Sequence, residues 1–144
     1  MRGSSSILRS KGTHVETVRP EATVLSAAWD LKLKRIGALV VSEDGSTVQG
    51  LISERDIVAG LTDHGPQILS MPVGTVMAPA TVTCAPEDTL TTVMTRMTRH
   101  RARHVPVVDG GRLAGIVSIG DIVKYRVDEL ELEANVLRDT LAAR

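Results

Sequence analysis

The sequence predicts an α/β (α+β) fold in which two β-α-β-β-α repeats pack with pseudo-twofold symmetry into one module. Residues 50–58 read GLISERDIV and residues 115–123 read GIVSIGDIV, so a Gly, two aliphatic residues, a Ser and an Asp recur at the same spacing. Extended and helical patterns also follow one another in the same order in both halves. Hydrophobic residues make up 42% of the 144-residue chain but aromatic residues only 1%, which predicts an aliphatic core.

Other positions of the two halves match as well. Pro20 matches Pro86, Gly50 matches Gly115, and the run that begins at Gly37 is aligned with the run that begins at His104. With this alignment the offset between the halves changes by one or two residues, in segments predicted to be loops. Insertions in loops are how a duplicated fold diverges.

Each repeat is predicted to open with a short strand that a proline ends. These strands cover residues 15–18 and 80–84, ahead of Pro20 and Pro86. Helices over residues 23–34 and 89–100 follow, because their apolar residues recur at intervals of three and four. Thr23 and Thr89 are the predicted N-caps of these helices.

A pair of strands and a second helix complete each repeat. Residues 38–41 and 105–108 are continuous aliphatic runs, typical of strands that are covered on both faces. Turns containing Asp and Gly lead to second strands over 48–52 and 113–117, and the last helices are predicted to begin at Ser53 and Ser118. The predicted organisation is an N-terminal segment (1–11), repeat 1 (12–65), a linker (66–72), repeat 2 (73–124) and a C-terminal amphipathic helix (125–144).

The C-terminal helix carries an apolar stripe at steps of three and four residues. The stripe contains Val127, Leu130, Ala134, Leu137 and Leu141. Two heptads are too few for an independent coiled coil, so the stripe needs either the rest of the chain or a partner subunit to cover it.

The duplicated junction has both a structural and a chemical interpretation. Ser53-x-x-Asp56 can form a capping box that fixes the start of a helix. The same helix start presents backbone N–H groups to an anion, and the Ser hydroxyl can join them at a phosphate. The Asp carboxylate, one turn on, can accept hydrogen bonds from the two hydroxyls of a ribose. Capping and ligand binding do not exclude each other.

Composition and charge exclude several classes of function. Seventeen basic residues balance seventeen acidic ones, so no electrostatic footprint for general DNA binding exists, and the scarcity of aromatic residues disfavours stacking on single-stranded nucleic acid. Cys84 is the only cysteine, which excludes an intrachain disulfide. No apolar run reaches the length of a membrane span and no signal-peptide pattern is present, so we expect a cytoplasmic protein without membrane contact.

The sequence offers no catalytic constellation and no metal site. His100 and His104 are four residues apart, but a third ligand is not evident. Around them, Arg99 and Arg101 are expected in a solvated loop at a helix end. No acid–base pair or phosphate loop can be identified, so we expect no enzyme and no catalytic cofactor.

Taken together, the β-α-β-β-α order, the Gly-h-h-Ser-x-x-Asp junction (h, aliphatic) and the run RHVPVVD at residues 103–109 resemble a tandem pair of CBS domains, named for cystathionine β-synthase. The resemblance covers about residues 12–124. It implies a stand-alone Bateman module that binds AMP, ADP, ATP, NAD or S-adenosylmethionine in two clefts between the repeats. It further implies that the Asp binds ribose, that the Ser binds phosphate, and that adenine lies against backbone of the first strand and of the strand after the first helix.

Carried over to this sequence, the resemblance implies two sets of ligand-binding residues. Cleft 1 comprises Lys11, Thr17, Ile36, Gly37, Ala38, Ser118, Gly120 and Asp121. Cleft 2 comprises Ser53, Arg55, Asp56, Met77, Thr81, Arg103, His104 and Val105. Cleft 2 has two arginines near the expected phosphate, whereas cleft 1 has Gly120 in place of Arg55 and only Lys11 as a basic neighbour. We therefore expect cleft 2 to prefer ligands with more phosphate charge.

The resulting functional hypothesis is a regulatory sensor of adenine nucleotides that signals to an effector protein. The resemblance also implies a homodimer formed by the helices of the repeats, which Trp29 could join. Two alternatives remain open at this point: a constitutive scaffold with degenerate clefts, and a small enzyme that acts on a nucleotide.

Overall fold

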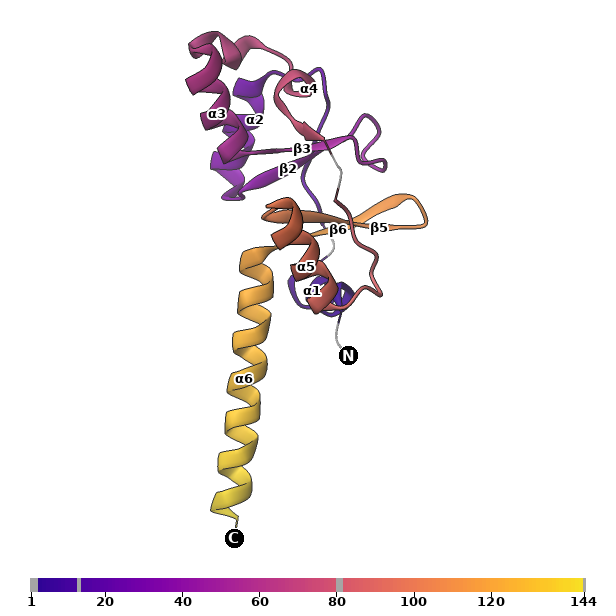
Figure 1. The fold of residues 1–144 in the computed structure, drawn as a ribbon, viewed down its shortest axis with the longest axis vertical. Coiled ribbons are helices and arrows are strands. Elements are labelled where there is room, and N and C mark those ends of the chain that lie inside the picture. Colours follow the sequence, from indigo (N-terminus) through magenta and orange to yellow (C-terminus); the bar gives the residue numbers. More distant parts are fainter. Residues whose placement is uncertain (1–2, 13, 80–81, 144) are drawn as a thin grey trace.

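The computed structural model describes residues 3–12, 14–79 and 82–143. It consists of two lobes, each built around a small sheet, and a long C-terminal helix that extends away from them (Figure 1). The first lobe spans residues 14–79; the second contains residues 82–143 together with the N-terminal segment 3–12. Each lobe has its own cluster of buried aliphatic side chains, which confirms the duplicated organisation.

The first lobe contains a four-stranded sheet in the order β1-β2-β3-β4. Strand β1 is parallel to β2, and β3 runs antiparallel to both β2 and β4. Helices α2 and α3 pack beside the sheet, and a short 3-10 helix and α4 lead into the last strand (Figure 1). The elements are β1 (Thr17–Val18), α2 (Val24–Lys34), β2 (Ala38–Val41), β3 (Gly50–Ser53), α3 (Glu54–His64), the 3-10 helix Pro66–Ser70, α4 (Val73–Val76) and β4 (Ala78–Pro79).

The second lobe repeats this plan around an antiparallel hairpin. Its elements are α5 (Leu90–His100), β5 (His104–Asp109), β6 (Arg112–Ser118) and α6 (Ile119–Ala142), with α1 (Ser4–Lys11) packed against them. The predicted strand 80–84 falls partly outside the described residues. Its described part forms only an isolated parallel bridge between Cys84 and Val107.

A proline explains the shortened pairing in the second lobe. In the first lobe the Val40 amide donates to the Glu16 carbonyl, 3.2 Å away, which holds the first strand against β2. Pro106 occupies the position equivalent to Val40, and it has no N–H to donate. The carbonyl of Pro106 still accepts from the Cys84 amide at 3.0 Å.

Threonine caps begin the first helix of each repeat, as predicted. The Thr23 hydroxyl accepts a hydrogen bond from the Ser26 amide and the Thr89 hydroxyl accepts one from the Thr92 amide, both at 3.1 Å. Both helices end in a left-handed residue, Arg35 (φ 54°) or Arg101 (φ 53°).

The register of the hairpins corrects the predicted alignment of the repeats. Ala38 pairs with Ser53 in the first lobe, and His104 pairs with Ser118 in the second. The Gly37 carbonyl accepts from the first amide of α3, just as the Arg103 carbonyl accepts from the first amide of α6. Gly37 is therefore equivalent to Arg103, and the predicted match of Gly37 with His104 is wrong by one residue. The offset changes only in the hairpin turn, because a slip within a strand would turn its buried side chains outward.

The short helices α1 and α4 each complete the core of the other half of the chain. The amides of Ser4 and Ser5 donate to carbonyls of residues 88 and 86, and Leu8 lies directly against Gly115. In the first lobe, Val73 and Gly74 donate in the same way to carbonyls of residues 22 and 20. The segment before repeat 1 thus packs on the second lobe, and the segment that begins repeat 2 packs on the first.

Helix α6 continues without a break from the predicted last helix of repeat 2 into the predicted C-terminal helix. It contains 24 residues and begins at the Ser118 cap. At 1.5 Å per residue it is about 36 Å long. No helix in the described part of the chain is long and apolar enough to span a membrane.

The Asp88 carboxylate holds the loop before α5 through hydrogen bonds. Part of the free energy of unfolding is therefore expected to depend on pH. Asp88 Oδ2 accepts from the Ala85 amide at 2.7 Å and from Arg96 Nη1 at 2.8 Å. The Ala85 amide first, and then Arg96, hold the pKa of Asp88 below its usual value of 3.8. The folded protein therefore favours the ionised carboxylate, and this stabilisation is present above about pH 4 and lost as the pH falls below it.

Thermal unfolding of Asp88→Asn against the unmodified protein checks this expectation. We expect the difference in Tm to be largest near pH 7 and to shrink at about pH 3. Asp44, whose pKa the Thr47 amide lowers, is present in both proteins and cancels in the difference. A difference in Tm that stays constant with pH would contradict the role of Asp88.

Candidate functional site

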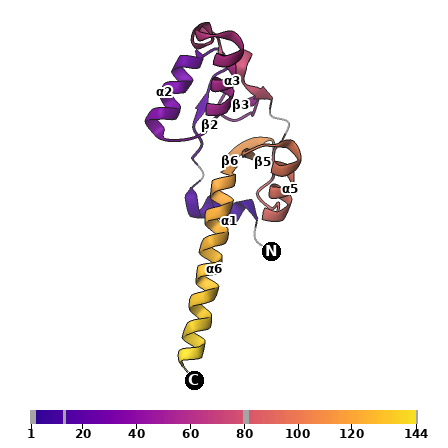
Figure 2. The same cartoon turned by 60° about the vertical axis from the view of Figure 1, so that its left-hand side comes forward.

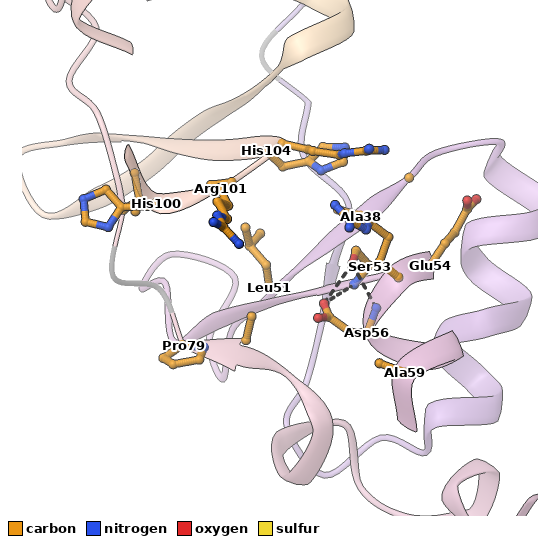
Figure 3. Close-up of a pocket in the computed structure, with 16 residues that line it drawn as sticks. Ala38, Leu51, Ser53, Glu54, Asp56, Ala59, Pro79, His100, Arg101 and His104 are labelled. Atoms are coloured by element: carbon orange, nitrogen blue, oxygen red, sulfur yellow. Dashed lines mark hydrogen bonds between the residues drawn. The ribbon is translucent and has the colours of Figure 1, made fainter. Parts of the chain in front are cut away.

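A cavity of about 650 Å³ lies between the two lobes. The start of α3 and the strands β2, β3 and β4 form one side of it, and the end of α5 and the start of β5 form the other (Figure 3). Its lining residues are Gly37, Ala38, Leu51, Ser53, Glu54, Arg55, Asp56, Ala59, Ala78, Pro79, Val82, His100, Arg101, Ala102, Arg103 and His104. A volume of this size is typical of small-molecule sites.

The start of α3 brings Ser53 and Asp56 together in a complete capping box. The Ser53 amide donates to Asp56 Oδ2 at 2.8 Å, and the Asp56 amide donates to Ser53 Oγ at 3.2 Å. The Ser53 hydroxyl itself donates to Oδ2 at 2.9 Å (Figure 3). Asp56 Oδ1 accepts no hydrogen bond from the described residues. The bonds to Oδ2 therefore fix the orientation of the carboxylate, while Oδ1 remains available to accept a hydrogen bond from a ligand. The predicted capping role is confirmed, and it leaves room for a ligand.

Arginines outnumber the carboxylates in the cavity lining. Arg55, Arg101 and Arg103 carry fixed positive charge, and the only carboxylates among the lining residues are those of Glu54 and Asp56. The Glu54 carboxylate points away from that of Asp56 (Figure 3). The N-terminus of α3 adds its partial positive charge to the same wall. This arrangement can attract an anion through the arginines and accept hydrogen bonds from hydroxyl groups at Asp56.

Five of the eight residues predicted for cleft 2 line this cavity. They are Ser53, Arg55, Asp56, Arg103 and His104. Met77 packs against the first-lobe core, and Val105 is fully buried in the second-lobe core, so these two side chains do not line the cavity. Thr81 lies outside the described residues.

The residues predicted for cleft 1 are not brought together in this cavity, apart from Gly37 and Ala38. Ser118 and Asp121 form the second capping box at the start of α6: the Asp121 amide donates to Ser118 Oγ at 3.0 Å, and the Ser118 amide donates to Asp121 Oδ2 at 2.9 Å. Gly120 lies in the first turn of that helix.

Three further residues of this predicted cleft lie elsewhere in the fold. Thr17 pairs with Val40 in the first sheet, and Ile36 packs against the first-lobe core. The backbone of Lys11 ends α1, and its side chain lies outside the described part of the chain.

The corrected register sharpens the chemical difference between the two repeats. The positions equivalent to Arg103 and His104 are held by Gly37 and Ala38, and Gly120 stands where α3 has Arg55. The small residues Gly37 and Ala38 leave space for the large side chain of His104. A Cβ atom on Gly37 would lie 3.2 Å from Nε2 of His104, so the imidazole packs over this glycine.

The sequence-based prediction missed several lining residues, Arg101 above all. Arg101 was expected in a solvated loop, but its left-handed backbone ends α5 and brings it to the cavity. Ala78 pairs with Leu51 across β3 and β4, which places both on the cavity wall. Ala78 and Pro79 immediately precede the predicted ligand-binding residue Thr81 in the sequence. This proximity could have been used to predict that they line the cavity.

Comparison with known proteins identifies the class to which this fold belongs. The family model of the CBS domain matches twice, at residues 10–63 and 73–128. The CBS domain-containing protein YhcV of Bacillus subtilis is 35% identical over 118 residues, which cover 82% of this chain and 83% of YhcV. The chain is a tandem pair of CBS domains and belongs to the CBS domain family.

Solved structures of CBS domain proteins share this fold over most of the chain. The CBS-domain protein ATU1752 of Agrobacterium tumefaciens is 41% identical with a TM-score of 0.81, covering 85% of this chain and 92% of that one. A CBS domain pair crystallised with 5′-methylthioadenosine and S-adenosyl-L-methionine is 23% identical with a TM-score of 0.78, covering 90% and 98%. At that identity the likeness shows the fold alone.

Family membership defines the general role of the chain. CBS pairs are regulatory modules that sense nucleotides, and stand-alone CBS-domain proteins are regulatory rather than catalytic. Within the described residues, no group of three or more His, Cys, Asp or Glu side chains could hold a metal ion.

Proposed function

We propose that this protein is a sensor of adenine nucleotides that binds AMP, ADP, ATP or NAD in the cavity between its lobes. The observation that carries the proposal is the Asp56 carboxylate, held through Oδ2 with Oδ1 available, in a cavity that three arginines also line. A ribose offers two neighbouring hydroxyl donors to such a carboxylate, and phosphates attract the arginines.

Each part of the nucleotide has a matching part of the cavity. Asp56 accepts from the ribose hydroxyls, and Arg55, Arg101 and Arg103 bind the phosphates. Leu51 and Val82 offer an apolar wall for the base. Adenine is the base we assign because the resemblance to CBS domain pairs implies an adenosine ligand.

Binding is proposed to signal through a homodimer to an effector protein. A row of apolar side chains on α2, formed by Leu25, Trp29 and Leu33, is 46–71% exposed and is suited to a subunit contact. The ligand lies between the lobes, so it can bias how the helices of the two lobes are arranged. It does so only if it binds one arrangement more tightly than another.

Titration calorimetry with AMP, ADP, ATP and NAD tests this function. We expect heat of binding and a rise in Tm with at least one of them. Mass spectrometry of small molecules that co-purify with the protein would identify the natural ligand. The absence of heat and of a thermal shift with all four would instead support a constitutive scaffold, and turnover of bound nucleotide would support an enzyme.

The charge of the cavity predicts a preference for ligands with more phosphate groups. We expect Arg103→Ala to weaken ATP binding about tenfold and AMP binding less, because a charge-assisted hydrogen bond to phosphate is worth about 1.5 kcal/mol. Calorimetry of both ligands measures the two losses. Arg99→Ala, which removes a neighbouring arginine that does not line the cavity, is the control. Equal losses for ATP and AMP would contradict the predicted preference for ligands with more phosphate groups.

A further inference from the structure

The distal part of α6 carries an apolar face that no described element covers. Figures 1 and 2 show the helix leaving the lobes and running alone to its C-terminal end. Each described residue from 135 to 143 is exposed. Val127, Leu130, Leu137 and Leu141 are 46–61% exposed, which is unusual for a row of large aliphatic side chains on a helix.

This apolar face is distinct from the face that α6 uses against the second lobe. Ile122 is buried there and Tyr125 packs against the same core. At about 100° per residue, the stripe through Val123, Val127 and Leu130 lies roughly 130° around the helix from that contact. The helix is therefore anchored on one side and presents a second, continuous apolar side to a partner.

The stripe has the residue pattern of a two-stranded parallel coiled coil. With Val127 at position a of the heptad, the a positions are Val127, Ala134 and Leu141, and the d positions are Val123, Leu130 and Leu137. The pair Val127 and Leu130, with a β-branched residue at a and Leu at d, favours a parallel dimer. We infer that the C-terminal helices of two copies of this chain pair in parallel and in register along this stripe.

Charge at the flanking heptad positions selects a second copy in the parallel orientation. In register, Arg126 (position g) faces Glu131 (position e) of the second copy, and Glu133 (g) faces Arg138 (e) of the second copy. Both contacts join opposite charges, and the twofold symmetry repeats each of them. The chain is thus complementary to itself along the stripe.

The antiparallel alternative lacks this complementarity. An antiparallel pair that overlaps fully along the stripe sets Val123 opposite Leu141 of the second copy. Glu131 then faces Glu131 of the second copy, and Lys124 faces Arg138 of the second copy. Like charges opposite one another disfavour this orientation.

Disulfide trapping of the 144-residue chain tests the pairing. In the parallel arrangement the two copies of residue 130 face each other, within the range of a disulfide. We expect Leu130→Cys to yield a covalent dimer under mild oxidation. Leu132→Cys, on the outer side of the helix and 62% exposed, should not. The unmodified chain, whose Cys84 is buried, sets the background.

Charge exchange provides a second, independent readout. We expect Arg126→Glu to weaken the dimer about tenfold, by sedimentation or light scattering, and the addition of Glu131→Lys to restore it. A monomeric mass at high micromolar concentration, equal trapping at residues 130 and 132, or failure of the second substitution to rescue the first would each overturn the parallel pairing.

Discussion

Replacement of Asp56 by alanine is expected to weaken nucleotide binding to the cavity by about 100-fold. Oδ1 of this carboxylate is the available acceptor that we assign to the ribose, and two hydrogen bonds to an ionised group are worth about 3 kcal/mol together. Titration calorimetry with the tightest-binding nucleotide measures the loss. A loss of less than about threefold would remove Asp56 from the binding site.

The duplicated fold offers a matched control for this substitution. Asp121→Ala removes the matching N3 carboxylate, which accepts from the Ser118 amide, from the start of α6, so both variants lose one half of a capping box. Asp121 does not line the cavity. We expect Asp121→Ala to leave binding at this cavity within about twofold of the unmodified protein. Equal losses in the two variants would point to destabilisation of the fold rather than to loss of a ligand contact.

Truncation of Leu8 to alanine is expected to destabilise the whole protein by about 3 kcal/mol, which corresponds to a fall in Tm of roughly 10 °C. Leu8 is only 5% exposed and belongs to the core of the second lobe, although it precedes the first repeat in the sequence. Thermal and urea unfolding followed by circular dichroism measure the change. Leu132→Ala, at a side chain that is 62% exposed on the outer side of α6, should change Tm by no more than about 2 °C.

A double-mutant cycle separates the contact of Leu8 from general loss of packing. A Cβ atom on Gly115 would lie 2.5 Å from Cδ2 of Leu8, so Gly115→Ala overlaps with this side chain. We expect Gly115→Ala to destabilise the unmodified protein but to be tolerated in Leu8→Ala, where the space is open. Additive effects would show that α1 does not hold Leu8 against β6.

The parts of the fold that could be predicted from the sequence are those that local chemistry determines. Thr23 and Thr89 cap helices through neighbouring amides, and Ser53 and Ser118 form capping boxes within three residues. The alignment of Gly37 with His104 failed because strand register depends on the partner strand, which the sequence does not display. Alternation along a strand could have separated His104 from Val105: one side chain lines the cavity and its neighbour enters the core.

For the cavity, too, residues in local sequence motifs could be predicted, whereas residues placed there by the tertiary fold could not. Ser53, Asp56 and Arg103 belong to recognisable motifs and were predicted together. Arg101 was missed because a left-handed turn at the end of α5, rather than a motif, directs it to the cavity. The packing of α1 on the second lobe was not predicted either, because it joins residues more than eighty positions apart in the chain.

The exchanged positions of α1 and α4 also constrain how the chain folds during synthesis. The first lobe cannot complete its core until Val73 has left the ribosome, which is after β1, β2, β3, α2 and α3 have been translated. Ile7 and Leu8 are made before either repeat, yet their binding site on β6 and α6 is made after most of the second repeat. The N-terminal segment must therefore wait, with its apolar side chains unburied, until nearly the whole chain is available. A nascent-chain series that stops before or after residue 118 should reveal this as late protection of residues 3–12 from proteolysis.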